Sequence, residues 1–210
     1  MSSKIARLTR WHDEDREKDG LLRHLVDSPL WEAFDKDHPQ FATDSRNIRL
    51  AFATDGFNPF RTMNVSYSVW HGICIPFNFP PSMCMKQSNF ILSYLIPGRN
   101  APGSDMDLYC QPLIYDLLDM FEHGVRTYDA SRGEHFQLRA AVLWTIIDFL
   151  GLGYVSGSVT SGEAACPDCH FFTDSLRLGN GMKTCYMGHR RFLHENHPFR
   201  FFANKFSGTT

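Results

Sequence analysis

The sequence lacks any long hydrophobic run, and its first residues contain no apolar segment of signal-peptide length. A membrane-spanning helix needs about 20 consecutive apolar residues, and no stretch reaches that length. We therefore expect an intracellular protein, nuclear or cytoplasmic, that is not secreted and has no membrane partner. Cysteines stay reduced in that environment, so the six cysteines are not expected to form disulfides.

The chain also lacks a strong net charge, which is −2 when histidines are counted as neutral. This balance gives no overall sign of a nucleic-acid partner. The charges are unevenly distributed, however, because residues 183–210 contain five Lys or Arg and one Glu, a local excess of +4. A basic tail on a neutral domain favours contact with phosphates, although a solvated surface segment would explain the same charges.

The chain has 210 residues, of which 43% are apolar and 14% aromatic, so it can build one domain with a substantial core. We expect an N-terminal extension (1–47), a central α/β domain (48–158) and a Cys/His segment with a basic tail (159–210). In the extension, Ser28 followed by proline is typical of a helix start, and the apolar spacing beyond it predicts a helix over Pro29–Asp37.

The central part begins with three β-rich segments that are separated by turn residues. They cover residues 49–56, 67–77 and 90–96, and proline or glycine follows the last two. Consecutive strands joined by turns predict an antiparallel meander.

The spacing of apolar residues then changes from that of a strand to that of a helix. Ser104–Asp105 can cap a helix that ends at His123–Gly124. A turn-rich link, residues 127–135, leads to a fourth strand over Leu138–Asp148, whose almost continuous apolar run predicts burial on both faces.

A right-handed crossover through the helix would place the fourth strand beside the first and parallel to it. These strands end in Asp55 and Asp148, and the ends of parallel neighbours meet at one edge of the sheet, where ligands bind in open α/β sheets. Two adjacent carboxylates repel each other unless a cation relieves them, and Mg²⁺ (or Mn²⁺) is the natural occupant. The alternative is that Asp55 is a turn residue and Asp148 a strand-terminating cap.

A Gly-rich stretch after Asp148, residues 151–158, predicts a bend. Beyond it, Cys166 and Cys169 are the cysteines with metal-ligand spacing, and a Cys-x2-Cys turn suits Zn²⁺. The alternative is a pair of buried reduced thiols. The other candidate zinc ligands are His189, His197, His194, Cys185 and His170.

The chain resembles one family over nearly its whole length, and the matching stretches occur in the same order as in that family. It is similar to the transposases of plant CACTA (En/Spm-type) DNA transposons, the tnp2-like transposases. The stretches that carry the resemblance are RWHDEDREKDGLLRH, RNIRLAFATDGFNPF, YSVWHGICIPFNFPPSMCMK, LSYLIPGRNAPGSDMDLYCQPLIYDL, RAAVLWTIIDF, ACPDC and CYMGHRRFLHENHPFR.

The resemblance implies an RNase H-like mixed sheet with three antiparallel strands, a helix and a parallel fourth strand. It also implies two aspartates and one glutamate that bind Mg²⁺ in order to cut and rejoin DNA, and by position the aspartates are Asp55 and Asp148. A zinc-binding insertion after the second aspartate would use Cys166, Cys169, His189 and His197, which ranks His194 below His197. The candidates for contact with DNA phosphates are Arg190, Arg191, Arg200 and Lys205.

The sequence departs from the family in two ways. Relatives usually read D-F-P-A-Y-G after the second aspartate, whereas residues 149–153 read FLGLG. The resemblance also places the glutamate beyond Thr210, so we expect a C-terminally truncated catalytic core.

The expected function is Mg²⁺-dependent cleavage and transfer of DNA strands at transposon ends, incomplete in this chain. One alternative is a non-catalytic remnant that binds zinc and DNA, and another is a degenerate reading frame without a selected function. The sequence leaves the oligomeric state open.

Overall fold

The computed structural model describes residues 3–60, 67–186 and 193–201. The chain forms two compact units, Met1–Ile147 and Asp148–Thr210. The elements of the first unit are, in chain order, α1 (Ser3–Leu8), α2 (Trp11–Glu14), η1 (Leu25–Asp27), α3 (Pro29–Asp37), α4 (Pro39–Ala42), β1 (Ile48–Phe57), β2 (Ser68–Pro76), α5 (Pro81–Cys84), η2 (Gln87–Asn89), β3 (Ile91–Gly98), η3 (Gly103–Asp105), α6 (Met106–Glu122), β4 (Val125–Asp129), β5 (Glu134–Leu138) and β6 (Ala140–Ile147).

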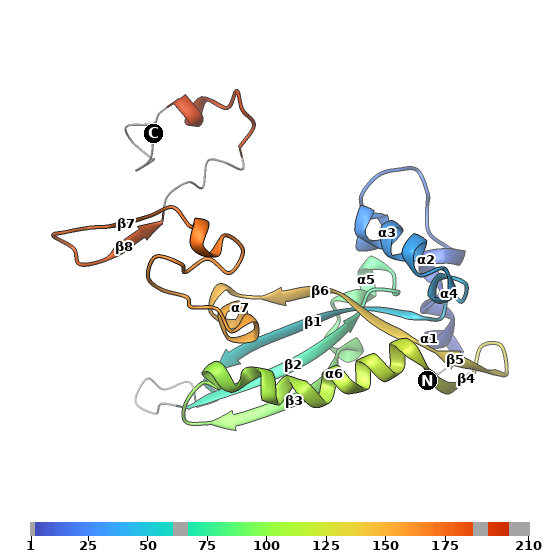
Figure 1. The fold of residues 1–210 in the computed structure, drawn as a ribbon. Coiled ribbons are helices and arrows are strands. Elements are labelled where there is room, and N and C mark those ends of the chain that lie inside the picture. The colour runs from blue at the N-terminus through green and yellow to red at the C-terminus, as the bar shows by residue number, and fades with distance from the viewer. Residues whose placement is uncertain (1–2, 61–66, 187–192, 202–210) are drawn as a thin grey trace. The chain divides into compact units, whose positions relative to one another are not determined.

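A four-stranded sheet of order β3-β2-β1-β6 forms the centre of the first unit (Figure 1). β1 pairs antiparallel with β2 and β2 with β3, so the predicted meander is confirmed. β6 lies parallel to β1 on its other side, from the pair Ile48–Ala140 to the pair Thr54–Ile147. The parallel fourth strand is confirmed as well, and the fold is a mixed α/β one.

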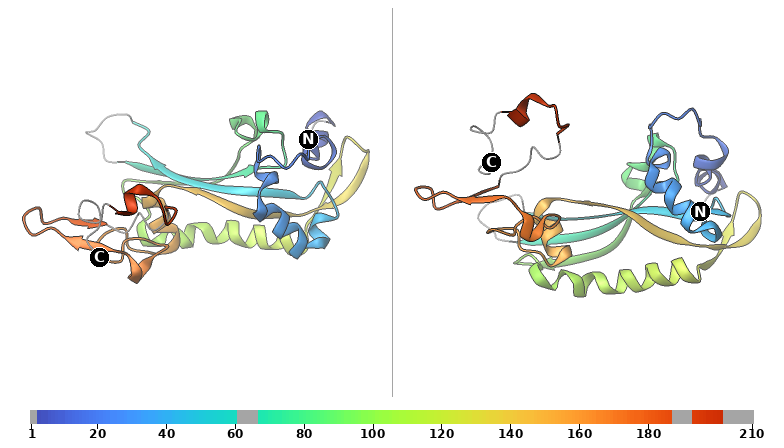
Figure 2. Two further views of the ribbon diagram at one scale, coloured as in Figure 1. Left: turned by 90° about the horizontal axis from the view of Figure 1, so that it is seen from above. Right: turned by 45° about the horizontal axis from the view of Figure 1, so that its top comes forward.

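Helix α6 lies along one face of this sheet (Figures 1 and 2). Its predicted extent is confirmed, with Asp105 at the N-cap position and Gly124 in the left-handed region (φ 71°) just after the helix. Met106 and Cys110 turn to the sheet and are buried. Between helix and sheet, the hydroxyl of Tyr94 donates to Thr54 Oγ1 at 3.1 Å and accepts from Cys110 Sγ at 3.5 Å.

The N-terminal helices cover the other face of the sheet, over the first half of β1. Val26 and Trp31 form the core there with Ala51 of β1 and Ile75 of β2. Helix α3 has the predicted bounds, and the Oγ of its N-cap, Ser28, accepts a hydrogen bond from the Trp31 amide at 3.3 Å. A side-chain cap of this kind satisfies one of the amides that a helix start leaves unpaired.

Arg49 connects these helices to the sheet from a fully buried position on β1. Its guanidinium group forms an ion pair with Asp35 of α3 and donates to the Asn47 carbonyl at 3.0 Å. The guanidinium also lies 4.9 Å from the ring centroids of both Trp31 and Phe41. The charge is therefore held between two aromatic faces, a favourable cation–π arrangement.

The link predicted over residues 127–135 is instead a β-hairpin formed by β4 and β5. The turn residues are as expected, but Val125, Tyr128 and Phe136 supply the strand-forming side chains on either side of the turn. Asp129 closes the turn, because its Oδ1 accepts from the Ser131 amide at 2.8 Å and from the Ser131 hydroxyl at 2.6 Å. The turn at the middle of the segment was predicted correctly, but the two strands on either side of it were not.

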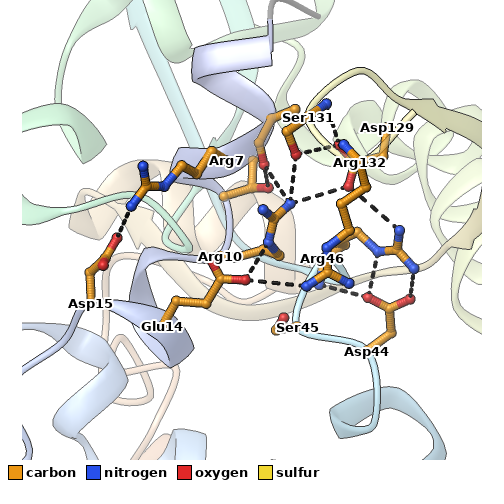
Figure 3. A network of polar contacts seen from close by, with 12 residues as sticks. Arg7, Arg10, Glu14, Asp15, Asp44, Ser45, Arg46, Asp129, Ser131 and Arg132 are labelled. Atoms are coloured by element: carbon orange, nitrogen blue, oxygen red, sulfur yellow. Dashed lines mark hydrogen bonds and ion pairs between the residues drawn. The ribbon is translucent and has the colours of Figure 1, made fainter. Parts of the chain in front are cut away.

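A network of charges joins this hairpin to the N-terminal helices (Figure 3). The buried Asp129 accepts from Arg10 Nη1 at 3.2 Å and forms a second ion pair with Arg46 at 3.5 Å. Burial alone would raise the pKa of Asp129, but the hydrogen bonds from Ser131 and the charge of Arg10 outweigh it and hold that pKa below its usual value. The carboxylate is thus the anionic centre that the buried Arg10 and the half-buried Arg46 share.

Strand β6 is not buried on both faces as its composition predicts. Val142 is 37% exposed and Ile146 46% exposed. β6 has a strand neighbour only on the β1 side within the described residues. An apolar run shows that a strand can be buried, but it does not show whether the strand is central or at an edge.

The second unit begins with α7 (Phe149–Ser156) and continues with η4 (His170–Phe172), β7 (Ser175–Arg177), β8 (Thr184–Tyr186) and η6 (Pro198–Phe201). The Gly-rich stretch is therefore largely helical, and the predicted bend is wrong. Gly153 is buried where a Cβ atom would clash with Thr160, and Gly157 (φ 67°) ends the helix. These glycines serve close packing and helix termination.

Replacing Asp129 by asparagine should cost about 3 kcal/mol of unfolding free energy, because the buried Arg10 and the half-buried Arg46 lose their shared counter-charge while the turn oxygen is kept. Urea unfolding at neutral pH measures this loss. The matched control is Glu134→Gln, which removes the exposed partner of Arg46 and should cost less than about 1 kcal/mol. Equal losses in the two variants would contradict the central role of Asp129.

Acid should destabilise the first unit through His12. Burial, and after it the charge of Arg49, lowers the pKa of His12 to about 4. The unfolded chain therefore takes up the proton first, so this contribution is fully present above pH about 6.5 and is lost as the pH falls towards about 4, a change of about 3 kcal/mol.

Unfolding free energies measured between pH about 7 and pH about 4.5 test this dependence. The decline should be clearly smaller in His12→Gln and unchanged in His135→Gln, since His135 is exposed on β5. An identical decline in both variants would show that other groups cause the acid sensitivity.

Candidate functional site

Asp55 lies within a strand and not in a turn. β1 continues through Asp55 and Gly56 to Phe57, so the interpretation of this Asp-Gly pair as a turn is wrong. The carboxylate is exposed, and its Oδ1 accepts from the Gly56 amide at 2.7 Å. A Cβ atom at position 56 would clash with the indole of Trp70, so glycine is required beside the aspartate. The strand thus presents a solvent-accessible carboxylate on a rigid backbone.

Asp148 follows the last residue of β6 and is the N-cap of α7. Its Oδ1 accepts from the Gly151 amide at 2.6 Å. A carboxylate at this position also benefits from the positive end of the helix dipole. Asp148 is therefore a cap, but of the helix that follows and not, as the alternative interpretation has it, of the strand itself.

The register of β1 and β6 relates the two candidate aspartates. Thr54 is the Cα partner of Ile147 in the parallel ladder. Asp55 and Asp148 are the residues that come next in the chain after these two partners. The last paired positions of both strands therefore lie at the same edge of the sheet, as the sequence predicts.

Cys166 and Cys169 form a tight turn in the second unit. The Cys169 amide donates to Cys166 Sγ at 3.3 Å, and the His170 amide donates to the Cys166 carbonyl at 2.7 Å. The amide of Cys169 is the main cause that lowers the pKa of Cys166. Both side chains are half-buried, so the interpretation as fully buried thiols is wrong. A turn that favours a thiolate is suited to metal ligation.

Only some of the other residues predicted to bind zinc or DNA lie among the described residues. His189, Arg190, Arg191 and Lys205 lie outside the described residues, and the side chain of Arg200, in η6, does too. The amide of His197 donates to the His194 carbonyl at 2.9 Å in the turn before η6. In the described ranges, no group of three or more His, Cys, Asp or Glu residues is arranged to hold a metal ion.

Comparison with known proteins gives one decisive match. A sequence model of the family described as "Transposase family tnp2" matches residues 19–210. The chain belongs to the tnp2 transposase family. No similar curated protein and no similar solved structure was found.

Membership of the tnp2 family makes the chain a transposase-like protein and points to DNA as its general class of partner. Among the described residues, no helix is long and apolar enough to cross a membrane.

One polar residue near the candidate site of this tnp2-family chain is missed by sequence reasoning. His71 of β2 is the Cα partner of Asp55. The two residues are sixteen positions apart and share no motif spacing. Only the register of the β1–β2 pair brings them together, and that register could not be read from the sequence because turn signals gave strand order without alignment.

The reactivity of the cysteines should follow their surroundings. Burial raises the pKa of Cys84 to about 12, whereas the pKa of Cys166 is lowered. Because the thiolate is the reactive form, iodoacetamide should alkylate Cys166 at least about 100-fold faster than Cys84 in the folded protein at neutral pH. Peptide mass spectrometry over time measures both rates, and similar rates would refute the assigned turn geometry.

Proposed function

We propose that this chain carries the metal-binding edge of a DNA transposase of the CACTA type, built on an RNase H-like sheet. The observation that supports the proposal best is the parallel β1–β6 ladder, whose last pair, Thr54 and Ile147, immediately precedes the two aspartates. An open sheet binds ligands at such an edge. The activity proposed is cleavage of a DNA phosphodiester followed by strand transfer.

In this proposal Asp55 and Asp148 are ligands of Mg²⁺ or Mn²⁺. The exposure of Asp55 supports the role, and the Gly56–Trp70 contact holds its backbone in place. A metal ion bound there would activate the attacking oxygen and stabilise charge on the leaving oxygen. In this proposal the chain's own task is to supply the two carboxylates as ligands, Asp55 from a strand and Asp148 from a helix cap, which are more precise supports than loops.

A separate zinc site would use Cys166 and Cys169 with His189 and His197. The donor hydrogen bond from the Cys169 amide to Cys166 Sγ fits a metal-bound thiolate, which needs donors to stabilise its charge. The role of this site would be structural, because four protein ligands leave no open position.

DNA phosphates are the proposed partners of the basic residues that follow the zinc ligands. A transposase acts where its DNA is, so we expect a nuclear protein. The residues assigned to phosphate contact are Arg190, Arg191, Arg200 and Lys205.

A second candidate function is a protein that binds zinc and DNA without cutting it. The turn at Cys166 favours this candidate, because the hydrogen bonds from the Cys169 amide to Cys166 Sγ and from the His170 amide to the Cys166 carbonyl involve no aspartate. The two functions differ in one measurable respect, which is whether binding of Mg²⁺ or Mn²⁺ depends on the aspartates.

Two substitutions of Asp148 separate its roles. Asp148→Asn keeps an oxygen for the Gly151 amide but loses the charge, whereas Asp148→Ala loses both. Both variants should lower Mn²⁺ affinity at least about tenfold in calorimetric titrations and abolish metal-dependent nicking of supercoiled plasmid DNA. Only the alanine variant should lose about 1 kcal/mol of unfolding free energy through the missing cap.

The control is Asp119→Asn on the exposed side of α6, where the carboxylate pairs with His123. It should change neither Mn²⁺ binding nor nicking. Wild-type Mn²⁺ affinity in the Asp148 variants would remove the aspartate site from the proposal and leave the zinc- and DNA-binding function.

A further inference from the structure

β2 places a histidine beside the first candidate aspartate. His71 lies directly opposite Asp55 in the antiparallel β1–β2 ladder. Residues so paired point to the same side of the sheet, with Cβ atoms about 4.5–5.5 Å apart. The ring of Phe57, two residues after Asp55, meets the His71 ring edge to face with centroids 5.7 Å apart. This contact is the one expected if all three side chains share that side.

The surroundings of the pair change along this side of the sheet. Further back, Ala53 of β1 and Ile73 of β2 pack against the core beneath the N-terminal helices. At the next position on this side, Asp55 is exposed and His71 half-buried. The Asp55–His71 pair therefore lies just beyond the part of the sheet that the apolar core covers, and its Asp55 side is exposed to solvent.

His71 also has an unsatisfied atom. Its Nδ1 is buried and has no hydrogen-bond partner among the described residues. Such an atom costs about 1–3 kcal/mol, which an isoleucine or valine at this strand position would avoid. Buried polar atoms in folded proteins usually have a partner, and a bound ion would supply one to this imidazole nitrogen.

We propose that His71 is a nitrogen ligand of the divalent cation held by Asp55, which makes the edge a mixed carboxylate–imidazole site. This inference rests on the proposed function, because it needs a cation at Asp55. Two side chains with Cβ atoms about 5 Å apart can both reach an ion about 2 Å from each ligand atom. Imidazole suits transition-metal ions, whereas Mg²⁺ prefers oxygen ligands, so the site should favour Mn²⁺ over Mg²⁺.

The test is Mn²⁺ binding to the full chain, followed by pulsed electron paramagnetic resonance, with one equivalent of Zn²⁺ added first to fill the cysteine site. The wild-type Mn²⁺ signal should show coupling to a ¹⁴N nucleus. His71→Leu should remove that coupling and weaken Mn²⁺ binding about tenfold, with a smaller effect on Mg²⁺. His71→Asp should restore Mn²⁺ binding through an oxygen ligand without restoring the coupling.

Stability measurements distinguish a ligand from a packing residue. The unfolding free energy of metal-free His71→Leu should not fall below wild type, because an unpaired buried nitrogen is removed. His135→Leu on β5 is the matched histidine control and should keep both the coupling and the affinity. A coupling that survives in His71→Leu, or a wild-type signal without coupling, would overturn the role of His71.

Asp55→Asn separates this inference from the proposed function. If Mn²⁺ binding is lost in Asp55→Asn but the wild-type signal shows no ¹⁴N coupling, the aspartate site stands and His71 is not its ligand. If Asp55→Asn binds Mn²⁺ as the wild type does, the aspartate site itself fails, and the mixed site fails with it.

Discussion

The first unit depends on the parallel pairing of two strands that are far apart in the chain. β1 and β6 meet first at Ile48 and Ala140. A clamp fixes this beginning, since the Ile48 amide donates to the Arg139 carbonyl and the Arg139 amide donates to Asn47 Oδ1, each at 2.8 Å. Asn47 is buried, so these bonds are shielded from water. The meander, α6 and the β4–β5 hairpin lie within the loop that this pairing closes, and its register sets which residues stand at the far edge.

The helices and strands whose signals are local could be predicted from the sequence. The bounds of α3 follow from Ser28 and Pro29, and the strand order follows from turn residues and the handedness of crossovers. The prediction was wrong where one composition is compatible with two different local structures. A glycine-rich stretch can bend or pack closely, and only the contact of Gly153 with Thr160 decides for packing. The pairing of Asp55 with His71 could not be predicted from the sequence, because a register error of one residue would turn His71 to the opposite side of the sheet.

The two candidate metal ligands of the sheet edge differ in how free they are. Among the described residues, the hydrogen bond recorded for the Asp55 carboxylate comes from the neighbouring Gly56 amide, whereas the Asp148 carboxylate caps α7. A cation bound to the Asp148 carboxylate and the amides of the first helical turn would both interact with the same negative charge. Asp148 Oδ1 is the atom that accepts from Gly151, so in the proposed site the metal would bind the other carboxylate oxygen. Binding and helix capping can then coexist on one side chain.

The ion network of Figure 3 also constrains how the protein is made. Arg10 reaches its buried partner, Asp129, across 119 positions of sequence. During synthesis the N-terminal helices leave the ribosome long before the hairpin exists, so Arg10 can pair with Glu14 early but gains its Asp129 partner only later. The same delay applies to β1, which waits for β6. Folding of this unit thus depends on non-local contacts, which form late and are slow to close.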